Sequence, residues 1–359
     1  MNTIYLYCPK GTTSPYNVGR KICSLAMEYP EPFDFVFLEQ NRKNICRGLD
    51  LRKRRALFHL PVQPWISLRP YWRCLNFFRS KGIPIVANIH GDYVNEPIDS
   101  FMDRDLVHGL LLAPSALASR FILKLPRYLI VNSLFMKKRI VETFGVDEEL
   151  IFVIPNGIDV PNDLRIDELR DYSNVHSSNK IVIFSHGTLT RGKGYFELIR
   201  AIASIKRDDF ILYISGYGPM KDKLEKLIHD LNIADKVILL GYTPFNDIMG
   251  YLSKADICIY PSKFDTFNIA SLESMLYSKG TVLISSQCGI KEFLPYNLEN
   301  NIFEPECEII ADRLMKAMND FHGVENLVKS QKDFANSLNW KNIWIFYKNI
   351  YQSIFDKMG

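Results

Sequence analysis

Short apolar runs rich in β-branched and aromatic residues alternate along this chain with longer stretches of helical period. Such an alternation is typical of a parallel sheet whose strands are joined by crossover helices. In the first half of the chain, the predicted strands are residues 3–8, 33–38, 56–60, 83–90, 128–132 and 150–155. The predicted helices between them are residues 18–29, 66–81, 98–125 and 133–144.

A polar stretch, NGIDVPNDLRIDELRDYSNVHSSN, interrupts this pattern and has the Pro, Gly, Asn and Ser content of a linker. A second series follows it. Its predicted strands are residues 180–187, 210–216, 236–241, 257–262 and 281–286. Its predicted helices are residues 194–205, 220–231, 246–254, 269–279 and 309–319. The sequence therefore predicts an α/β protein with two Rossmann-like, doubly wound domains, and ligand in the crevice between them at the carboxyl ends of the strands.

We place the first domain at residues 1–159, a linker at 160–178 and the second domain at 179–340, with a terminal helix at 341–359 that packs back on the first domain. A chain of 359 residues is long enough for two such domains, each with its own core. Its composition, 47% hydrophobic and 23% charged, is that of an ordered globular protein.

No part of the sequence has the character of a targeting or membrane segment. The first residues lack a basic stretch followed by a long apolar run, and no stretch reaches about 18 uninterrupted apolar residues. We therefore expect a cytoplasmic protein. The seven cysteines are scattered, odd in number and without a CxxC pair, which argues against disulfides and a structural zinc site.

The net charge of +4 conceals a basic segment at residues 42–81. This segment holds eleven Lys or Arg and one acid, Asp50, so it carries +10 and the remainder of the chain carries −6. Its cations are interleaved with aromatic residues, a mixture that suits an anionic membrane surface. The first interpretation of this segment is nevertheless a solvated basic face with aromatics in the core. The second is contact with an anionic membrane or lipid acceptor, which would make the protein peripheral at the inner face of the membrane, and binding of single-stranded nucleic acid through base stacking is not expected.

The segment HGTLTRGKG, after the first strand of the second series, has the outline of a phosphate site. Gly187, Gly192 and Gly194 let the backbone approach a ligand, the following helix supplies amide donors, and Arg191 and Lys193 supply positive charge. The segment matches neither a Walker A loop nor GxGxxG. An ordinary strand-to-helix turn is the alternative interpretation.

Two further strand ends in the second series also carry glycine. Gly216 and Gly218 precede a predicted helix, and Gly241 ends the next strand. Each glycine alone is compatible with simple turn chemistry. Three such strand ends in succession predict a sheet edge without side chains, which a bound nucleotide requires for close approach.

The stretch PSKFDTFNIASLESMLYSKG places Asp265 before a predicted helix and Glu273 inside it. With Asn268 as the N-cap, the amides of residues 266–270 point outward from the positive end of the helix, where a diphosphate binds favourably. The two carboxylates then flank the anion and accept hydrogen bonds from sugar hydroxyls. The alternative is an Asp favoured by the helix dipole and a Glu on the surface.

This stretch resembles the E-x7-E signature of the retaining GT-B glycosyltransferases of family four. Four other segments resemble the family in the same order along nearly the whole chain: LIFVIPNGID, HGTLTRGKGYFELIRAI, ISGYGPMKDKLEKLI and VILLGYTPFNDIMGYLSKADICIYPS. The resemblance implies a GT-B fold with the nucleotide-sugar donor in the second domain and the acceptor in the first.

The resemblance also implies roles for single residues. Lys193 contacts the donor diphosphate, Glu273 the ribose and Asp265 the transferred sugar. His90, in IPIVANIHGD, lies beside the reacting sugar, and Gly19, in SPYNVGRKICSLA, lies in a Gly-rich first loop near the diphosphate. Backbone amides of residues 267–269 complete the cradle for the phosphates. The residues predicted to bind the donor are Gly19, Gly187, Arg191, Gly216, Gly241, Thr266, Phe267, Asn268 and Ile269.

The chain departs from the family pattern at several of these positions. Thr188 replaces an Arg and so removes one diphosphate cation unless Arg191 substitutes for it. Asp265 replaces a Glu and Asn268 replaces a Gly. The first loop has one glycine where many members have two. These changes bear on the identity of the donor sugar more than on activity.

The resulting hypothesis is a hexosyltransferase of class EC 2.4. It moves a sugar from a UDP- or GDP-linked donor, with retention of configuration, to a hydroxyl of a glycan or lipid-linked acceptor in polysaccharide or glycolipid biosynthesis. It needs no metal or cofactor, and the acidic triplet at residues 103–105 is interpreted as surface charge. The alternatives are a GT-B epimerase or phosphorylase and a non-catalytic protein that binds sugar nucleotides or lipid carriers.

Overall fold

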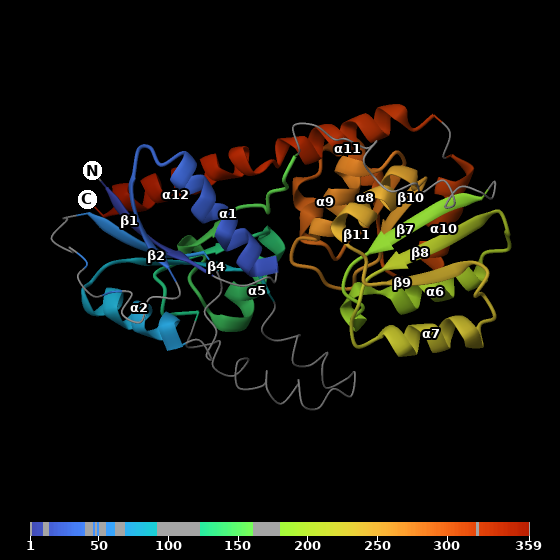
Figure 1. The fold of residues 1–359 in the computed structure, drawn as a ribbon, viewed down its shortest axis with the longest axis horizontal. Helices are drawn as coiled ribbons and strands as arrows, with labels where there is room; N and C mark the ends of the chain where they lie inside the picture. Colours follow the sequence, from blue (N-terminus) through green and yellow to red (C-terminus); the bar gives the residue numbers. More distant parts are fainter. Residues whose placement is uncertain are drawn as a thin grey trace. The chain divides into compact units, whose positions relative to one another are not determined.

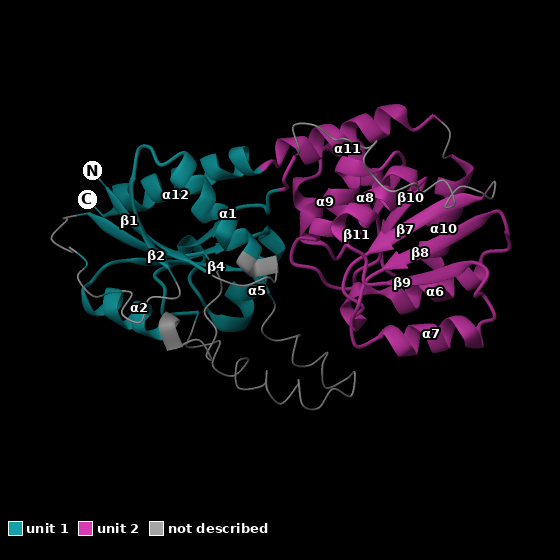
Figure 2. Ribbon diagram, in the orientation of Figure 1, with its two compact units in different colours: residues 1–101, 106–157, 340–359 teal, residues 102–105, 158–339 magenta. Residues whose placement is uncertain are grey.

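A computed structural model describes residues 2–9, 14–39, 46, 49, 55–61, 69–91, 123–160, 180–320 and 323–358. The chain divides into two compact units (Figure 2). The first contains residues 1–101, 106–157 and 340–359, and the second contains residues 102–105 and 158–339. The acidic triplet at residues 103–105, and almost all of the predicted helix at 98–125 and of the linker at 160–178, lie outside the described residues.

The first unit is built on a six-stranded parallel sheet with the order β2-β1-β3-β4-β5-β6 (Figure 1). Nearly every residue of β1, β3, β4 and β5 is buried, as expected for strands that are covered on both faces. The strands are β1 (Thr3–Cys8), β2 (Asp34–Glu39), β3 (Ala56–Leu60), β4 (Ile85–Ile89), β5 (Tyr128–Val131) and β6 (Ile151–Val153).

Helices cover both faces of this sheet. Helices α2 (Arg69–Ser80) and α5 (Leu134–Phe144) pack on one face, where Phe78 and Ile140 are fully buried with the inward residues of the strands. Helices α1 (Ser14–Glu28) and α12 (Trp340–Lys357) cover the other face, so the end of the chain belongs to the first unit.

The second unit repeats this architecture with the strand order β12-β11-β10-β7-β8-β9. Helices α6 (Tyr195–Ser204), α7 (Lys221–Asp230) and α10 (Cys307–Asn319) share one core with the sheet. Helices α8 (Phe245–Lys254), α9 (Ile269–Tyr277) and α11 (Glu325–Ser337) cover the other face. The strands are β7 (Ile181–His186), β8 (Phe210–Ser215), β9 (Val237–Gly241), β10 (Ile257–Tyr260), β11 (Thr281–Ser285) and β12 (Ile302–Phe303).

The predicted fold class is confirmed: both units are parallel, doubly wound α/β layers. Every predicted strand forms, with ends shifted by two residues at most. The prediction missed α11 and β12, and it began α1 four residues too late. No helix in the described part of the chain is long and apolar enough to cross a lipid bilayer.

A buried polar chain attaches α12 to the sheet of the first unit. Tyr351 donates its hydroxyl hydrogen to Nδ1 of His59 (2.7 Å), and Nε2 of His59 donates to Oδ1 of Asn88 (2.8 Å). Asn88 donates in turn to the hydroxyl of Tyr347 (2.6 Å). Burial is the largest influence on His59 and lowers its pKa to about 4, because the charged ring cannot be solvated there.

The lowered pKa of His59 predicts that the protein loses stability in mild acid. The pKa of an unfolded His is 6.5 and that of folded His59 is about 4, so between these values the unfolded chain takes up the proton. The free energy of unfolding should therefore fall as pH decreases from 6.5 to 4, by about 3 kcal/mol from this group. Urea unfolding at several pH values measures the slope.

The matched variants for this experiment are His59→Gln and His229→Gln, because His229 is 90% exposed. His59→Gln should reduce the slope between pH 6.5 and 4 by about 1 kcal/mol per pH unit, whereas His229→Gln should leave it unchanged. An unchanged slope in His59→Gln would show that this ring titrates normally in the folded protein.

Candidate active site

The strand order of the second unit locates a switch point between β7 and β10. Strands β8 and β9 lie on one side of β7, and β10, β11 and β12 lie on the other. The chain therefore leaves the carboxyl ends of β7 and β10 in opposite directions, which creates a binding crevice in doubly wound sheets. Residues 187–194 follow β7, and residues 261–268 lead from β10 into α9.

These two segments touch through their backbones. A Cβ atom on Gly194 would lie 1.9 Å from the carbonyl oxygen of Pro261, and the amide of Lys263 donates to the carbonyl of Gly192 (2.8 Å). Gly194 also has a φ of 72°, a left-handed conformation that favours glycine. Glycine at this position lets the loop that carries Lys193 lie directly on the loop that carries Asp265.

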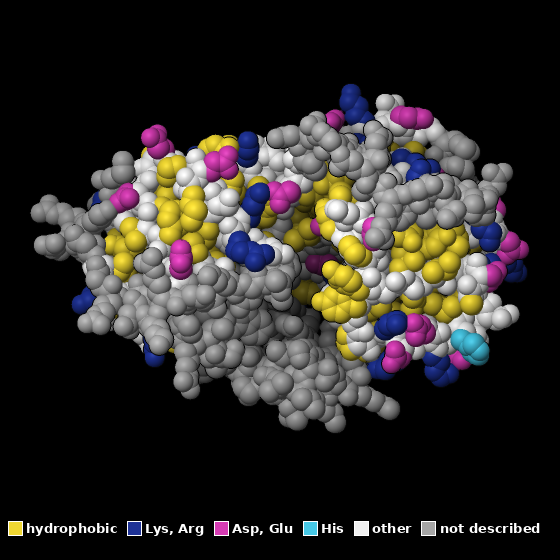
Figure 3. Space-filling view, in the orientation of Figure 1, with side chains coloured by type: hydrophobic (Ala, Val, Ile, Leu, Met, Phe, Trp, Pro, Cys, Tyr) yellow, Lys and Arg dark blue, Asp and Glu magenta, His cyan; other side chains and the backbone are white. Residues whose placement is uncertain are grey.

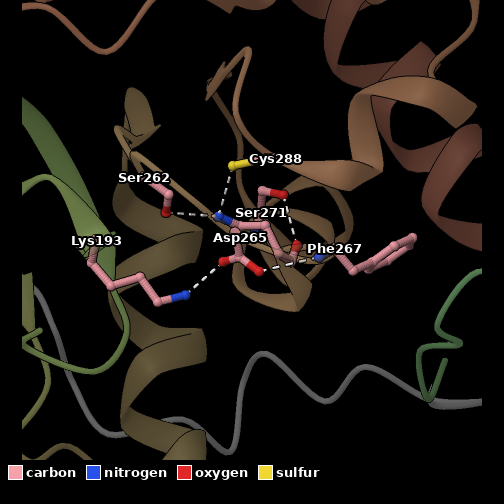
Figure 4. A network of polar contacts seen from close by, with 7 residues as sticks. Lys193, Ser262, Asp265, Phe267, Ser271 and Cys288 are labelled. Atoms are coloured by element: carbon pink, nitrogen blue, oxygen red, sulfur yellow. Dashed lines mark hydrogen bonds and ion pairs between the residues drawn. The ribbon is translucent and has the colours of Figure 1, made fainter. Parts of the chain in front are cut away.

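Lys193 and Asp265 form a partly buried ion pair. The ammonium nitrogen lies 2.5 Å from Oδ2 of Asp265, and Oδ1 accepts a hydrogen bond from the amide of Phe267 at 3.2 Å (Figure 4). Burial alone would lower the pKa of Lys193, but the charge and hydrogen bond of Asp265 outweigh it, so the pKa is raised above its usual value. Lys193 is therefore held as a cation at this edge of the sheet.

Exposed ion pairs on helices of the same unit differ from this pair. Lys226 and Asp230 on α7 are 74% and 50% exposed, whereas Lys193 and Asp265 are 27% and 12% exposed. On the face of the second unit drawn in Figure 3, both signs of charge are interspersed in this exposed manner. Surface pairs contribute little because water screens them, so the partly buried Lys193–Asp265 pair fixes its two side chains more firmly than the exposed Lys226–Asp230 pair does.

Asn268 caps α9 and confirms the N-cap prediction. Its Oδ1 accepts a hydrogen bond from the amide of Ser271 (2.9 Å), and its backbone is left-handed, with φ 79°. Asn tolerates this conformation better than most residues, which explains how Asn268 can stand where the signature that the stretch resembles has a glycine. Its Nδ2 donates to Oγ of Ser262 (3.4 Å) and Sγ of Cys288 (3.3 Å), so the cap is fixed on both sides (Figure 4).

Glu273 lies in the second turn of α9 and contacts a histidine that the sequence interpretation missed. Its Oε2 lies 2.8 Å from Nε2 of His186, the last residue of β7. Nδ1 of the same ring lies 2.8 Å from the hydroxyl of Tyr260 at the end of β10. The one sequence signal for His186 is its place at a strand end directly before Gly187.

The glycines at the strand ends have different reasons for being glycine. A Cβ on Gly216 would lie 1.8 Å from the carbonyl oxygen of Gly187, so the close packing of two strand ends requires it. A Cβ on Gly241 would meet nothing within 4 Å. Gly187 and Gly241 lie at the sheet edge where ligand is expected. Gly216 does not need a ligand to explain it, because packing within the protein already requires glycine there.

Arg191, Thr266 and Ile269 belong to the second unit with Lys193 and Asp265, whereas two of the predicted site residues, His90 and Gly19, lie in the first unit. His90 follows β4, is half-buried, and donates Nε2–H to the carbonyl of Pro61 (3.4 Å). Burial is the largest influence on this ring and lowers its pKa to about 4. Gly19 is buried inside helix α1 (Ser14–Glu28), in agreement with the predicted helix at 18–29, and not in the loop that the resemblance implies.

No group of three or more His, Cys, Asp or Glu side chains in the described part of the chain is arranged to hold a metal ion. The side chains of Lys193, Asp265 and Glu273 and the cap of α9 all lie at the switch point of the second sheet.

Two family models match this chain. The model described as Glycosyl transferases group 1 matches residues 167–346, and the model described as Glycosyltransferase Family 4 matches residues 25–161. The chain belongs to the glycosyl transferases group 1 family. The Lys193 turn, the cap of α9 and Glu273 all lie within the segment matched by the group 1 model.

Curated relatives of this glycosyl transferases group 1 protein come from organisms as different as a Campylobacter and a Methanocaldococcus. The N-acetylgalactosamine-N,N'-diacetylbacillosaminyl-diphospho-undecaprenol 4-alpha-N-acetylgalactosaminyltransferase of Campylobacter jejuni is 30% identical over 289 residues, which cover 80% of this chain and 69% of that protein. An uncharacterized glycosyltransferase of Methanocaldococcus jannaschii is 29% identical over 235 residues, which cover 62% of this chain and 59% of its own length.

Solved structures confirm the GT-B fold of this group 1 chain. Sucrose-phosphate synthase from Thermosynechococcus elongatus has a TM-score of 0.71 and 15% identity, and the match covers 99% of this chain and 100% of that one. HepE of Anabaena, in complex with UDP and glucose, has a TM-score of 0.69 and 16% identity, with 98% and 100% covered.

The contact between the two loops predicts unequal effects of adding one methyl group. Gly194 and Gly241 have nearly the same φ, 72° and 71°, but only Gly194 has a carbonyl in the way. Gly241→Ala should lower the free energy of unfolding by about 1 kcal/mol through backbone strain alone, and Gly194→Ala by about 3 kcal/mol or more. Urea unfolding measures both; equal losses would contradict the loop contact.

The ion pair predicts how Lys193 titrates when its partner is neutralised. In Asp265→Asn the attraction is lost and burial remains, so the pKa of Lys193 should fall. Nuclear magnetic resonance of ¹³C-methylated lysines over a pH series measures it without any ligand. As a control, Asp230→Asn leaves the site untouched and should leave the pKa of Lys193 unchanged; a Lys193 pKa that also stays constant in Asp265→Asn contradicts the pair.

Proposed function

We propose that this chain transfers a sugar from a nucleoside diphosphate sugar to a hydroxyl of a glycan or lipid-linked acceptor. The observation that carries the proposal is the grouping of one cation, one helix N-terminus and two carboxylates at the switch point of the second unit. A sugar nucleotide has a diphosphate between two sugars, so it can bind the cation and the helix N-terminus through its phosphates and the two carboxylates through its hydroxyls.

The diphosphate is assigned to Lys193 and the amino end of α9. The ammonium supplies positive charge, and the amides of residues 266–269 supply donors at the positive end of the helix, with the Phe267 amide shared between the phosphate and Asp265. Arg191, in the same turn as Lys193, adds a second cation in place of the arginine that Thr188 replaces. This arrangement favours a bound diphosphate and stabilises it further as it becomes the leaving group.

The two carboxylates are assigned to the two sugars of the donor. Glu273 accepts hydrogen bonds from the ribose hydroxyls, and Asp265 accepts them from the transferred sugar. Asp265 already accepts from Lys193 and from the amide of Phe267, so the sugar hydroxyls share its remaining lone pairs. This shared use restricts which hydroxyl pattern fits and makes Asp265 a determinant of donor specificity.

The reaction proceeds by substitution at the anomeric carbon with retention. The bond between this carbon and the diphosphate oxygen breaks, and a bond to the acceptor oxygen forms on the same face of the sugar. The acceptor proton passes to the departing phosphate oxygen. His90, neutral because burial holds its pKa to about 4, binds beside the reacting sugar as a hydrogen-bonding group rather than as a cation.

The relatives suggest which substrates to test first. HepE was solved with UDP and glucose, and the Campylobacter jejuni relative is named for a sugar linked to diphospho-undecaprenol. We therefore take a UDP-sugar as the first donor and a polyprenyl diphosphate glycan as the first acceptor. GDP-sugars remain the alternative donors.

A transfer assay with radiolabelled UDP- and GDP-sugars and a membrane extract as acceptor tests the proposal. Glu273→Ala should weaken donor binding about tenfold or more. His90→Ala should lower kcat about a hundredfold or more with donor affinity largely kept. Glu225→Ala on the exposed surface of α7 is the control and should behave as the wild type. Unchanged kinetics in both site variants would remove the assignment, and donor binding without transfer would favour a non-catalytic binding protein.

A further inference from the structure

His186 is a buried histidine between two side chains of the candidate site. Its side chain is 7% exposed, and its ring lies against the ring of Phe184 in the same strand. Nε2 lies 2.8 Å from Oε2 of Glu273, and Nδ1 lies 2.8 Å from the hydroxyl of Tyr260. Both ring nitrogens are thus occupied by partners within the protein.

The directions of these hydrogen bonds follow from the chemistry of the partners. A carboxylate only accepts, so Nε2 of His186 donates to Glu273. In the neutral form of the ring Nδ1 then accepts, so the hydroxyl of Tyr260 donates to it. The oxygen of Tyr260 is also hydrogen-bonded to Oγ of Ser274, one residue after Glu273 on α9. This series of hydrogen bonds runs from Glu273 through His186 and Tyr260 to Ser274. It begins and ends on α9 and selects one tautomer of His186.

One oxygen of Glu273 is left for a ligand. Within the described part of the chain, Oε2 has His186 as its partner and Oε1 has no hydrogen-bond partner. The carboxyl side chain is 22% exposed, so a ligand can reach it, whereas His186 has neither exposure nor a spare nitrogen. His186 therefore acts on a ligand through Glu273 and not directly.

We propose that His186 is a positioning residue that fixes the Glu273 carboxylate so that its unpartnered oxygen receives the ribose hydroxyls of the donor. The proposal rests on the proposed function, in which Glu273 binds the ribose. A flexible Glu loses rotamer entropy when it binds a diol, and a carboxylate already held by a buried donor has lost that freedom beforehand. Preorganisation of this kind strengthens contacts to the hydroxyls and leaves the diphosphate contacts unchanged.

The test compares two probes by calorimetry. The first is UDP or GDP, whichever binds the wild type more tightly, and the second is its 2′,3′-dideoxy counterpart, which lacks the ribose hydroxyls. The dissociation constant of the dideoxy nucleotide divided by that of the parent nucleotide isolates the contribution of the ribose hydroxyls. In the wild type this ratio should be about tenfold or more, as for hydrogen bonds to a charged group.

His186→Phe keeps a flat ring and removes the donor to Glu273. It should reduce the ratio to about threefold or less while the dideoxy nucleotide binds as before. His186→Gln places an amide donor at a similar reach and should restore part of the ratio. His229→Gln, on the exposed side of α7, is the matched control and should behave as the wild type.

A merely structural role for His186 predicts a different result. If His186→Phe weakens both nucleotides equally, or keeps the wild-type ratio, the positioning role is overturned. Different results would contradict the proposed function itself. These are that neither nucleotide binds the wild type, or that Glu273→Ala keeps the wild-type ratio of dissociation constants. A loss of the ratio in both Glu273→Ala and His186→Phe, with partial recovery in His186→Gln, supports the proposal.

Discussion

The candidate site depends on one backbone contact, between Gly194 and Pro261. A side chain at residue 194 would collide with the Pro261 carbonyl, so the loop after β7 rests on the loop after β10 without any spacing group. Lys193 is the residue before this contact and Asp265 lies four residues beyond Pro261. Their ion pair is therefore set by a rigid junction of two loops rather than by the flexibility of a long side chain.

Much of this site could be predicted because its determinants are local in sequence. The N-cap at Asn268 and the turn around Lys193 follow from residue type and spacing within one loop. Elements whose stability comes from tertiary contacts were missed. Helix α11 (Glu325–Ser337) buries the polar Gln331, which bonds to the amide of Val282 and the carbonyl of Gly280, and a hydrophobic pattern does not detect such a contact.

His186 was missed for the same physical reason. Its partners Glu273 and Tyr260 are 87 and 74 residues away, and no local pattern connects them. The buried His59 is bonded to Tyr351 across 292 residues, and no local pattern connects this pair either. In both units a histidine on a parallel strand joins a distant helix through a tyrosine or carboxylate, so the position of the ring depends on the assembled sheet. Residue type and spacing alone do not distinguish such a histidine from an ordinary one.

The Lys193–Asp265 pair does not have to break for an anion to bind. An ammonium has three N–H donors, and Asp265 takes one of them, so two remain for phosphate oxygens. A diphosphate placed there adds negative charge to that of Asp265, and both favour the charged form of Lys193. The pair therefore holds the cation close to the helix N-terminus, which also attracts an anion, and under the proposed function a diphosphate binds there while Lys193 keeps its contact with Asp265.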